Sequence, residues 1–135
     1  MTHPLEKVEA ITLFVEDRHR SKVFYESLLG AGPVYEDESS VVFRVGSLVV
    51  NLLDVRAADE LVAPAPVAVH DHGARFQLTI GVEDVDAACA VLAERGIELL
   101  NGPLDRPWGV RTAAFADPSG HVWELAQELP KDGFS

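Results

Sequence analysis

Glu124 is the ionisable side chain in the setting most suited to chemistry in this sequence of 135 residues. It lies in the apolar, strand-like segment 122–127, between Trp123 and Leu125. A carboxylate in such surroundings can act as a general base, hold a cationic group of a ligand, or hydrogen-bond to Gln77 as a purely structural contact. We favour the ligand contact or the structural contact over catalysis, and the residues alone leave all three open.

Histidine and cysteine offer weaker candidates. His70, Asp71 and His72 form a tempting metal-ligand cluster, because imidazole is a common ligand. They lie in the Ala-, Pro- and His-rich stretch 56–74, where we expect a solvated loop whose side chains do not converge. Cys89 shares a helical stripe with apolar residues, so we expect a small buried hydrophobe. The single cysteine has no internal disulfide partner, and with no signal-like start we predict a cytoplasmic protein.

A third candidate is the loop that contains Trp108. This residue stands between Pro107 and Gly109, a setting better suited to stacking on a planar ligand or to contact with a second subunit than to a core. Arg111 follows closely. It can recognise an anionic group, although a salt bridge to one of the many acidic side chains is the simpler interpretation.

The elements that must position these residues come from an internal repeat. Residues 12–17 (TLFVED) match residues 79–84 (TIGVED) at four of six positions. Each segment alternates as a strand does and ends at an acidic helix start, Asp17 or Asp84. The aliphatic face of each strand is expected to pack under the helices, which leaves the mixed face to line an open surface.

The same order of elements follows in both halves. Helices are expected from Asp17 to Gly30 and from Asp84 to Gly96, because both begin at a capping residue and end at glycine. Strands are expected at 34–36, 41–45, 48–53, 97–100, 111–116 and 122–127. Strand, helix and three strands, repeated, predict an α+β fold of two βαβββ modules. We expect one domain over 1–135, with modules at about 8–55 and 75–128 and a linker at about 56–74.

Composition excludes several partner classes. The formal net charge of −11 disfavours nucleic acid, because phosphates would be repelled. No apolar run approaches the ~20 residues that a membrane span needs, so no membrane partner is expected.

The sequence resembles the vicinal oxygen chelate superfamily, which includes glyoxalase I, fosfomycin- and bleomycin-resistance proteins and extradiol dioxygenases. The likeness is carried by residues 24–30 (FYESLLG), by the two VED helix starts, and by residues 117–125 (DPSGHVWEL). It covers nearly everything from residue 8 to 128. It implies an incomplete barrel around a cleft and a homodimer.

The resemblance also implies where a metal would be held. In the metal-dependent relatives the ligands come from the first and last strands of each module, and the matching positions are Ala10, Asn51, Gln77 and Glu124. The family pattern there is typically His or Gln, Glu, His and Glu. Alanine has no donor atom, and amide oxygens are weak ligands for Zn, Ni, Mn or Fe. No cofactor is favoured, and a divalent metal is the minority alternative.

Strand alternation and the Trp108 loop predict the ligand-binding set. Its members are Thr12, Phe14, Asn51, Gln77, Trp108, Thr112 and Glu124. A mostly apolar lining with a few polar anchors is typical of a small-molecule pocket, although the same residues can fill a small barrel.

The leading hypothesis is a metal-independent small-molecule binder similar to bleomycin-resistance-type drug or metabolite binders. The alternative is an enzyme, a glyoxalase-like lyase or isomerase or a dioxygenase, with a non-standard metal site that uses Glu124. A third possibility is an interaction module with a filled barrel. Whether the chain is an enzyme, and which ligand it takes, are left open at this stage.

Overall fold

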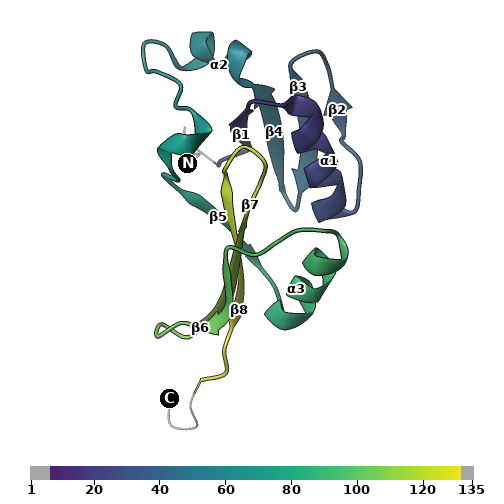
Figure 1. Cartoon of the computed structure of the whole chain (residues 1–135), viewed down its shortest axis with the longest axis vertical. Coiled ribbons are helices and arrows are strands. Elements are labelled where there is room, and N and C mark those ends of the chain that lie inside the picture. The colour runs from purple at the N-terminus through teal and green to yellow at the C-terminus, as the bar shows by residue number, and fades with distance from the viewer. Residues whose placement is uncertain (1–6, 132–135) are drawn as a thin grey trace, which may run out of the picture. The chain divides into compact units, whose positions relative to one another are not determined.

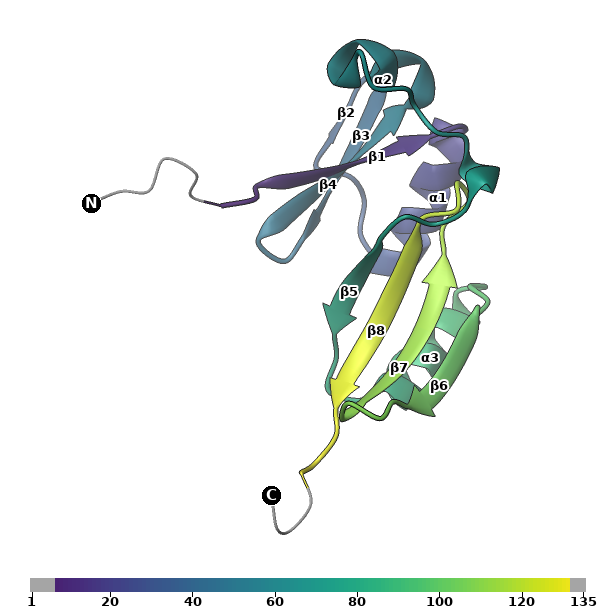
Figure 2. The same ribbon diagram turned by 90° about the vertical axis from the view of Figure 1, so that its left-hand side faces the viewer.

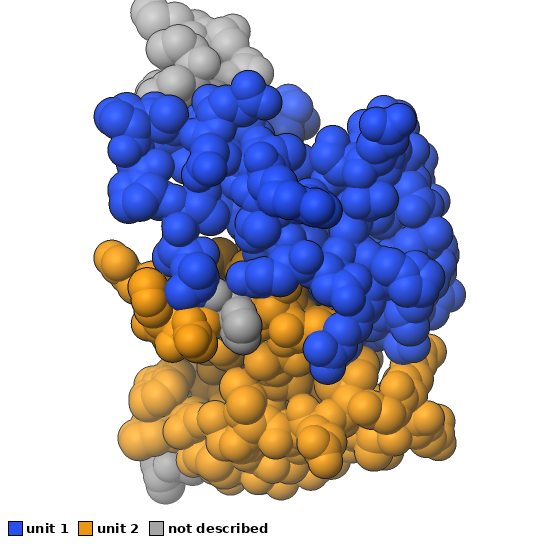
Figure 3. All heavy atoms as spheres, turned by 45° about the horizontal axis from the view of Figure 1, so that its top comes forward, with its two compact units in different colours: residues 1–69 blue, residues 70–135 orange. Residues whose placement is uncertain are grey.

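Two compact units make up the chain in a computed structural model that describes residues 7–131. They are Met1–Val69 and His70–Ser135, coloured separately in Figure 3. Each unit contains one four-stranded mixed sheet and one principal helix. Within the described residues, no helix has both the length and the apolar character needed to cross a membrane.

The first unit begins with a βαβββ run. Its elements are β1 (Ala10–Val15), α1 (Arg18–Leu29), β2 (Tyr35–Glu36), β3 (Ser40–Val45), β4 (Leu48–Asp54) and α2 (Val55–Val62). The sheet order is β1-β4-β3-β2 (Figure 1). The first strand pairs with the last in parallel, and the other pairs are antiparallel.

The second unit repeats this arrangement. After a 3₁₀ turn at His70–His72 come β5 (Gln77–Gly81), α3 (Val85–Glu94), β6 (Asn101–Asp105), β7 (Val110–Ala116) and β8 (Val122–Glu128). The sheet order β5-β8-β7-β6 can be followed in Figure 2, and β5 again pairs with β8 in parallel. The predicted pair of βαβββ modules is therefore confirmed.

Both predicted helix starts are confirmed by the capping contacts. The Asp17 carboxylate accepts a hydrogen bond from the Arg20 backbone N–H at 3.0 Å, and Asp84 accepts one from Ala87 N–H at 3.0 Å. Each bond satisfies a donor in the first turn that has no partner inside the helix. At the other end of α1, Gly30 has φ 67°, a left-handed conformation that glycine adopts without a steric penalty.

One face of each sheet forms the core beneath its helix. In the first unit Tyr25 of α1 packs against Phe43 of β3 with ring centroids 6.0 Å apart, and both side chains are buried. The other buried residues on these faces have alternating strand positions. They are Leu13, Val15, Val41, Val50 and Leu52 in the first unit, and Ala113, Phe115, Trp123 and Leu125 in the second. The aliphatic strand faces therefore pack on the helices, as alternation predicted.

Two sequence-based expectations need correction. The stretch 56–74 does not begin as a linker, because α2 (Val55–Val62) occupies its first part and packs near β4 and β1. The strand expected at 97–100 is displaced, since β6 is Asn101–Asp105. Ile97 N–H instead donates a hydrogen bond to Leu92 O at 2.9 Å, at the C-terminal end of α3. Hydrogen bonding to β7 begins at Leu100. The sequence did not predict β6 at this position, because it contains Gly102 and Pro103 and such residues usually interrupt a strand.

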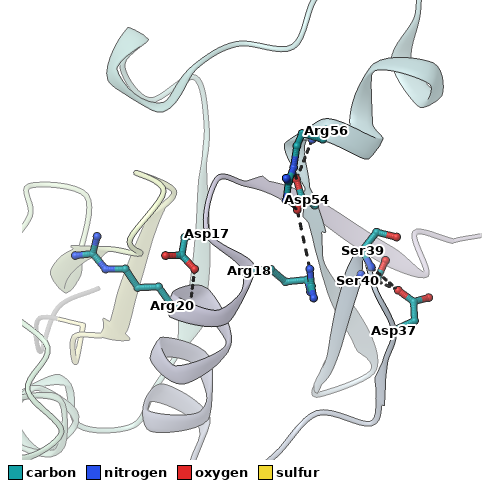
Figure 4. Close-up of polar contacts among 8 residues, drawn as sticks. All are labelled: Asp17, Arg18, Arg20, Asp37, Ser39, Ser40, Asp54 and Arg56. Atoms are coloured by element: carbon teal, nitrogen blue, oxygen red, sulfur yellow. Dashed lines mark hydrogen bonds and ion pairs between the residues drawn. The ribbon is translucent and has the colours of Figure 1, made fainter.

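Asp54 joins β4 to α2 through a cluster of charged contacts shown in Figure 4. Its carboxylate accepts from the backbone N–H of Arg56 at 3.0 Å and from Arg56 Nε at 3.0 Å, and Arg18 Nη1 lies 4.0 Å away. The hydrogen bonds from Arg56 hold the pKa of the Asp54 carboxyl at about 2, below its ordinary value of 3.8. The ionised form therefore caps α2 and stabilises the fold.

Replacing Asp54 by asparagine should lower the free energy of unfolding by about 1 kcal/mol at pH 7, a modest value because Arg56 is largely exposed. Since the pKa is lower in the folded state, the carboxylate contribution is complete above about pH 4 and is lost as the pH falls toward 2. Urea unfolding of both proteins across this range measures the difference. Asp59→Asn, on an exposed site of the same helix, is the control. A gap between wild type and Asp54→Asn that is as large at pH 2 as at pH 7 would contradict the assignment.

Candidate functional site

The face of the second sheet opposite α3 carries three of the predicted site residues, Gln77, Thr112 and Glu124. Backbone register places one row across its four strands: Thr79, Glu124, Ala114 and Asn101. Residues paired in register project from the same side of a sheet. The next row contains Ala126 and Thr112, so the side chains between the polar positions are small.

Glu124 is held by a threonine. Its Oε1 accepts a hydrogen bond from Thr79 Oγ1 at 3.0 Å, and its side chain is half-buried. The expected structural contact with Gln77 is wrong, because Gln77 pairs with Val122 and is exposed. Glu124 bonds to Thr79 because the strand register places these two residues opposite each other. The carboxylate keeps further acceptor capacity, which a ligand donor can use.

Arg106 is a member of the site that sequence reasoning missed. Its Nε donates to Thr112 Oγ1 at 2.9 Å and its Nη2 to Asn101 Oδ1 at 3.4 Å. The β6–β7 turn brings it there, with Gly109 N–H donating to Arg106 O at 3.1 Å. Thr112 is only 1% exposed, so the predicted ligand contact at this position is covered by the sheet and by Arg106. The signal available in the sequence was an arginine directly before the Pro107-Trp108-Gly109 turn.

Trp108 lies outside the core, as the sequence indicated. It is 69% exposed, and the Arg106 guanidinium lies 6.0 Å from its ring centroid. A large aromatic ring with this exposure next to a cation is suited to binding a planar group. Its role as a ligand or subunit contact stays a prediction.

Arg111 has the structural role that was the simpler interpretation. Its guanidinium donates two hydrogen bonds to Asp86, at 2.9 and 3.0 Å, and one to Asp105 at 3.0 Å. These bonds tie α3 to β6 and β7, and they lower the pKa of the Asp86 carboxyl. Arg111 is thus engaged with carboxylates and is poorly suited to anion recognition.

In the first unit, the open face of the sheet carries three predicted residues. Thr12 and Asn51 are partners in register, and Phe14 lies two positions along from Thr12 on the same side of β1. The Oδ1 of Asn51 is buried and has no hydrogen-bond partner among residues 7–131. A buried acceptor without a donor costs about 1–3 kcal/mol, so this oxygen is suited to a donor from a ligand or from water.

The superfamily's metal positions hold a donor set that does not fit a divalent ion. In the first unit Ala10 offers no donor and Asn51 a neutral amide. In the second, Gln77 offers another amide and Glu124 the one carboxylate, which already accepts from Thr79. Within residues 7–131 there is no group of three or more His, Cys, Asp or Glu side chains placed to hold a metal. Asp71 and His72 are exposed in the 3₁₀ turn, and the side chain of His70 lies outside the described residues.

The remaining candidates have structural settings. Cys89 is half-buried on α3, and burial raises the pKa of its thiol, which disfavours the nucleophilic thiolate. His121 lies at the turn before β8, where its Nδ1 is 2.8 Å from Asp117 Oδ2. Asp117 Oδ1 also accepts from the backbone N–H groups of Ser119 and His121. The carboxylate thus organises this turn.

Comparison with known proteins gives the family. The model of the Glyoxalase/Bleomycin resistance protein/Dioxygenase superfamily matches residues 7–125. The chain belongs to this superfamily. The uncharacterized protein YraH of Bacillus subtilis (strain 168) is 31% identical over 128 residues, which cover 91% of this chain and 99% of YraH.

Solved structures share the fold. A glyoxalase/bleomycin resistance protein/dioxygenase from Nocardioides is similar with a TM-score of 0.83 and 25% identity, over 98% of this chain and 90% of that one. TnmS3, an antibiotic binding protein from Streptomyces sp. CB03234, has a TM-score of 0.69 and 27% identity, over 94% of this chain and 99% of its own. The predicted superfamily and fold class are confirmed.

Gly102 allows β6 to approach β7 and so positions both Asn101 and Arg106. A Cβ on Gly102, which has φ +85°, would lie 2.4 Å from Thr112 O and 2.8 Å from Ala113 Cα. Gly109 has a similar φ of +93°, but a Cβ there would meet nothing within 4 Å. We predict that Gly102→Ala lowers the free energy of unfolding by about 2 kcal/mol more than Gly109→Ala, because only the former adds a backbone clash. Urea denaturation measures both, and equal losses would show that the close approach is not required.

Proposed function

We propose that this protein binds a small organic molecule without a metal ion, on the sheet face that lies opposite a principal helix. The observation that carries the proposal is the donor set at the superfamily's metal positions, where alanine and two amides stand instead of imidazole and carboxylate. One carboxylate and two neutral amides compensate poorly for the hydration that a divalent ion gives up. The same side chains are well suited to hydrogen bonds with an organic ligand.

Two further observations support binding. The buried Oδ1 of Asn51 lacks a donor, and the exposed Trp108 ring offers a stacking surface. TnmS3, which shares the fold at 27% identity, is an antibiotic binding protein. We therefore propose a drug or metabolite as the ligand, and resistance to such a drug as the biological role. Homodimeric assembly and a cytoplasmic location stay predictions.

The alternative proposal is an enzyme that uses Glu124. The half-buried carboxylate of Glu124 is held by a hydrogen bond from Thr79 and can accept a proton from a bound substrate. The superfamily includes glyoxalases and dioxygenases, but neither chemistry has its usual donors at the matching positions here. Glu124→Gln separates the proposals, because it should abolish turnover in an enzyme and only weaken binding in a binder.

The test of binding uses the full chain after dialysis against a chelator, with its metal content checked by elemental analysis. A thermal-shift panel should contain planar, cationic and glycopeptide antibiotics and planar organic acids. A ligand at about 100 times its Kd adds about 2.7 kcal/mol of stability, which raises Tm by several degrees. We expect such a shift in the chelated protein. Stoichiometric Zn, Ni, Mn or Fe that resists dialysis and is needed for the shift would contradict the proposal, as would a panel without any shift.

Variants at two buried oxygens that have no partner within the described part of the chain sharpen this test. Asn51→Leu removes the unpaired acceptor, so it should raise the stability of the free protein by about 1 kcal/mol and weaken ligand binding. Ser21→Ala is the matched control, because Ser21 Oγ is also buried without a partner but lies on α1. It should stabilise the protein and leave binding unchanged. Undiminished binding by Asn51→Leu would remove Asn51 from the ligand site.

A further inference from the structure

We propose that Arg106 binds the anionic group of a planar aromatic acid whose ring lies beside Trp108. This inference rests on the proposed small-molecule binding and names the class of ligand. The residues that carry it belong to the second unit alone: Arg106, Trp108, Asn101, Thr112 and Ala114.

The guanidinium of Arg106 is already oriented before any ligand arrives. Thr112 Oγ1, on a side chain that is 1% exposed, accepts from Nε at 2.9 Å, and Asn101 Oδ1 accepts from Nη2 at 3.4 Å. A guanidinium has five N–H donors, so its remaining donors, including both on Nη1, have no hydrogen-bond partner among residues 7–131. A cation held in this way loses little side-chain freedom when it binds an oxyanion.

Both partners of Arg106 are neutral. Lys22, Arg56 and Arg111 each form an ion pair with a carboxylate, whereas no carboxylate of the described part of the chain pairs with Arg106. Arg20, Arg44 and Arg75 also have no carboxylate partner among residues 7–131. Arg106 differs from them because two neutral side chains hold its guanidinium. The charge of Arg106 is therefore available for an anion, and bidentate binding of a carboxylate or sulfonate suits its planar fork.

The surroundings favour a flat ligand with one negative charge. Trp108 is 69% exposed, and its ring centroid lies 6.0 Å from the guanidinium carbon. Ala114, which is small and buried, separates Asn101 from Glu124 in the register row. Glu124, on the same sheet face, disfavours a second negative charge on the ligand. A ring stacked near Trp108 with a single acid group on Arg106 satisfies all of these constraints.

The experiment compares an acid with its neutral isostere, 2-naphthoate with 2-naphthamide, by isothermal titration calorimetry on the chelator-treated full chain. Wild type should bind the acid about tenfold or more tightly than the amide, as expected for a charge-assisted hydrogen bond. Arg106→Gln should reduce this preference to less than about twofold, and Arg106→Lys should keep part of it. Trp108→Ala should weaken the binding of the acid and of the amide by the same factor, since it removes the ring contact and not the charge.

Arg95→Gln is the matched control, because it removes the same charge at the end of α3, on the opposite side of the sheet. It should leave the acid preference unchanged, and thermal unfolding should show that every variant is folded. A tenfold preference retained by Arg106→Gln, or equal binding of acid and amide by wild type, would overturn the inference. If other panel compounds bind but neither naphthyl probe does, the inference fails and the proposed function stands. If no compound binds, both fail.

Discussion

The constraint on which the rest of the structure depends is that each four-stranded sheet has one principal helix packed on one face. Parallel pairing of the first and last strands, β1 with β4 and β5 with β8, requires a crossover, and the helix in that crossover packs on the aliphatic face. Tyr25 against Phe43 represents this packing in the first unit. The face opposite that helix is therefore left to carry a mixed set of side chains, and the candidates Thr12, Phe14, Asn51, Gln77 and Glu124 lie on such faces.

On the second sheet, Glu124 and Arg106 form hydrogen bonds to different neutral partners and not to each other. Glu124 takes its hydrogen bond from Thr79, and Arg106 gives its own to Thr112 and Asn101. The acid and the base do not neutralise each other in an ion pair, so each keeps hydrogen-bonding capacity for a third party. Arg111 shows the opposite arrangement, with its charge met by Asp86 and Asp105 and its role confined to stability.

Local signals made much of the fold predictable from the sequence. Asp17 and Asp84 were recognised as caps because a carboxylate before an apolar stripe has a direct physical function, and the repeat of TLFVED by TIGVED predicted the second module. The helix at Val55–Val62 was missed although Asp54 caps it, because the Ala- and Pro-rich composition that follows suggested a linker. β6 was displaced because Gly102 and Pro103 rarely occupy a strand interior.

The site was predictable only where alternation along one strand decides which way a side chain points. This placed Thr12, Asn51 and Glu124 on the open faces, but strand pairing, which alternation does not determine, chose Thr79 over Gln77 as the partner of Glu124. Arg106 was not predicted as a site residue for a related reason. It reaches the sheet from a turn, and only the folded turn brings its guanidinium to Thr112.

The central claim is that an organic ligand binds to a sheet face opposite a principal helix and needs no metal. The most direct measurement is an ¹H–¹⁵N NMR titration of the chelator-treated protein with the compound that gives the largest thermal shift. The account predicts shifts of backbone amides on such a face, either around Asn51 in the first unit or around Ala114, Glu124 and Ala126 in the second. The amides of the exposed sides of α1 and α3 should be unmoved. Shifts centred on those helices, or shifts that arise only after a divalent metal is added, would contradict it.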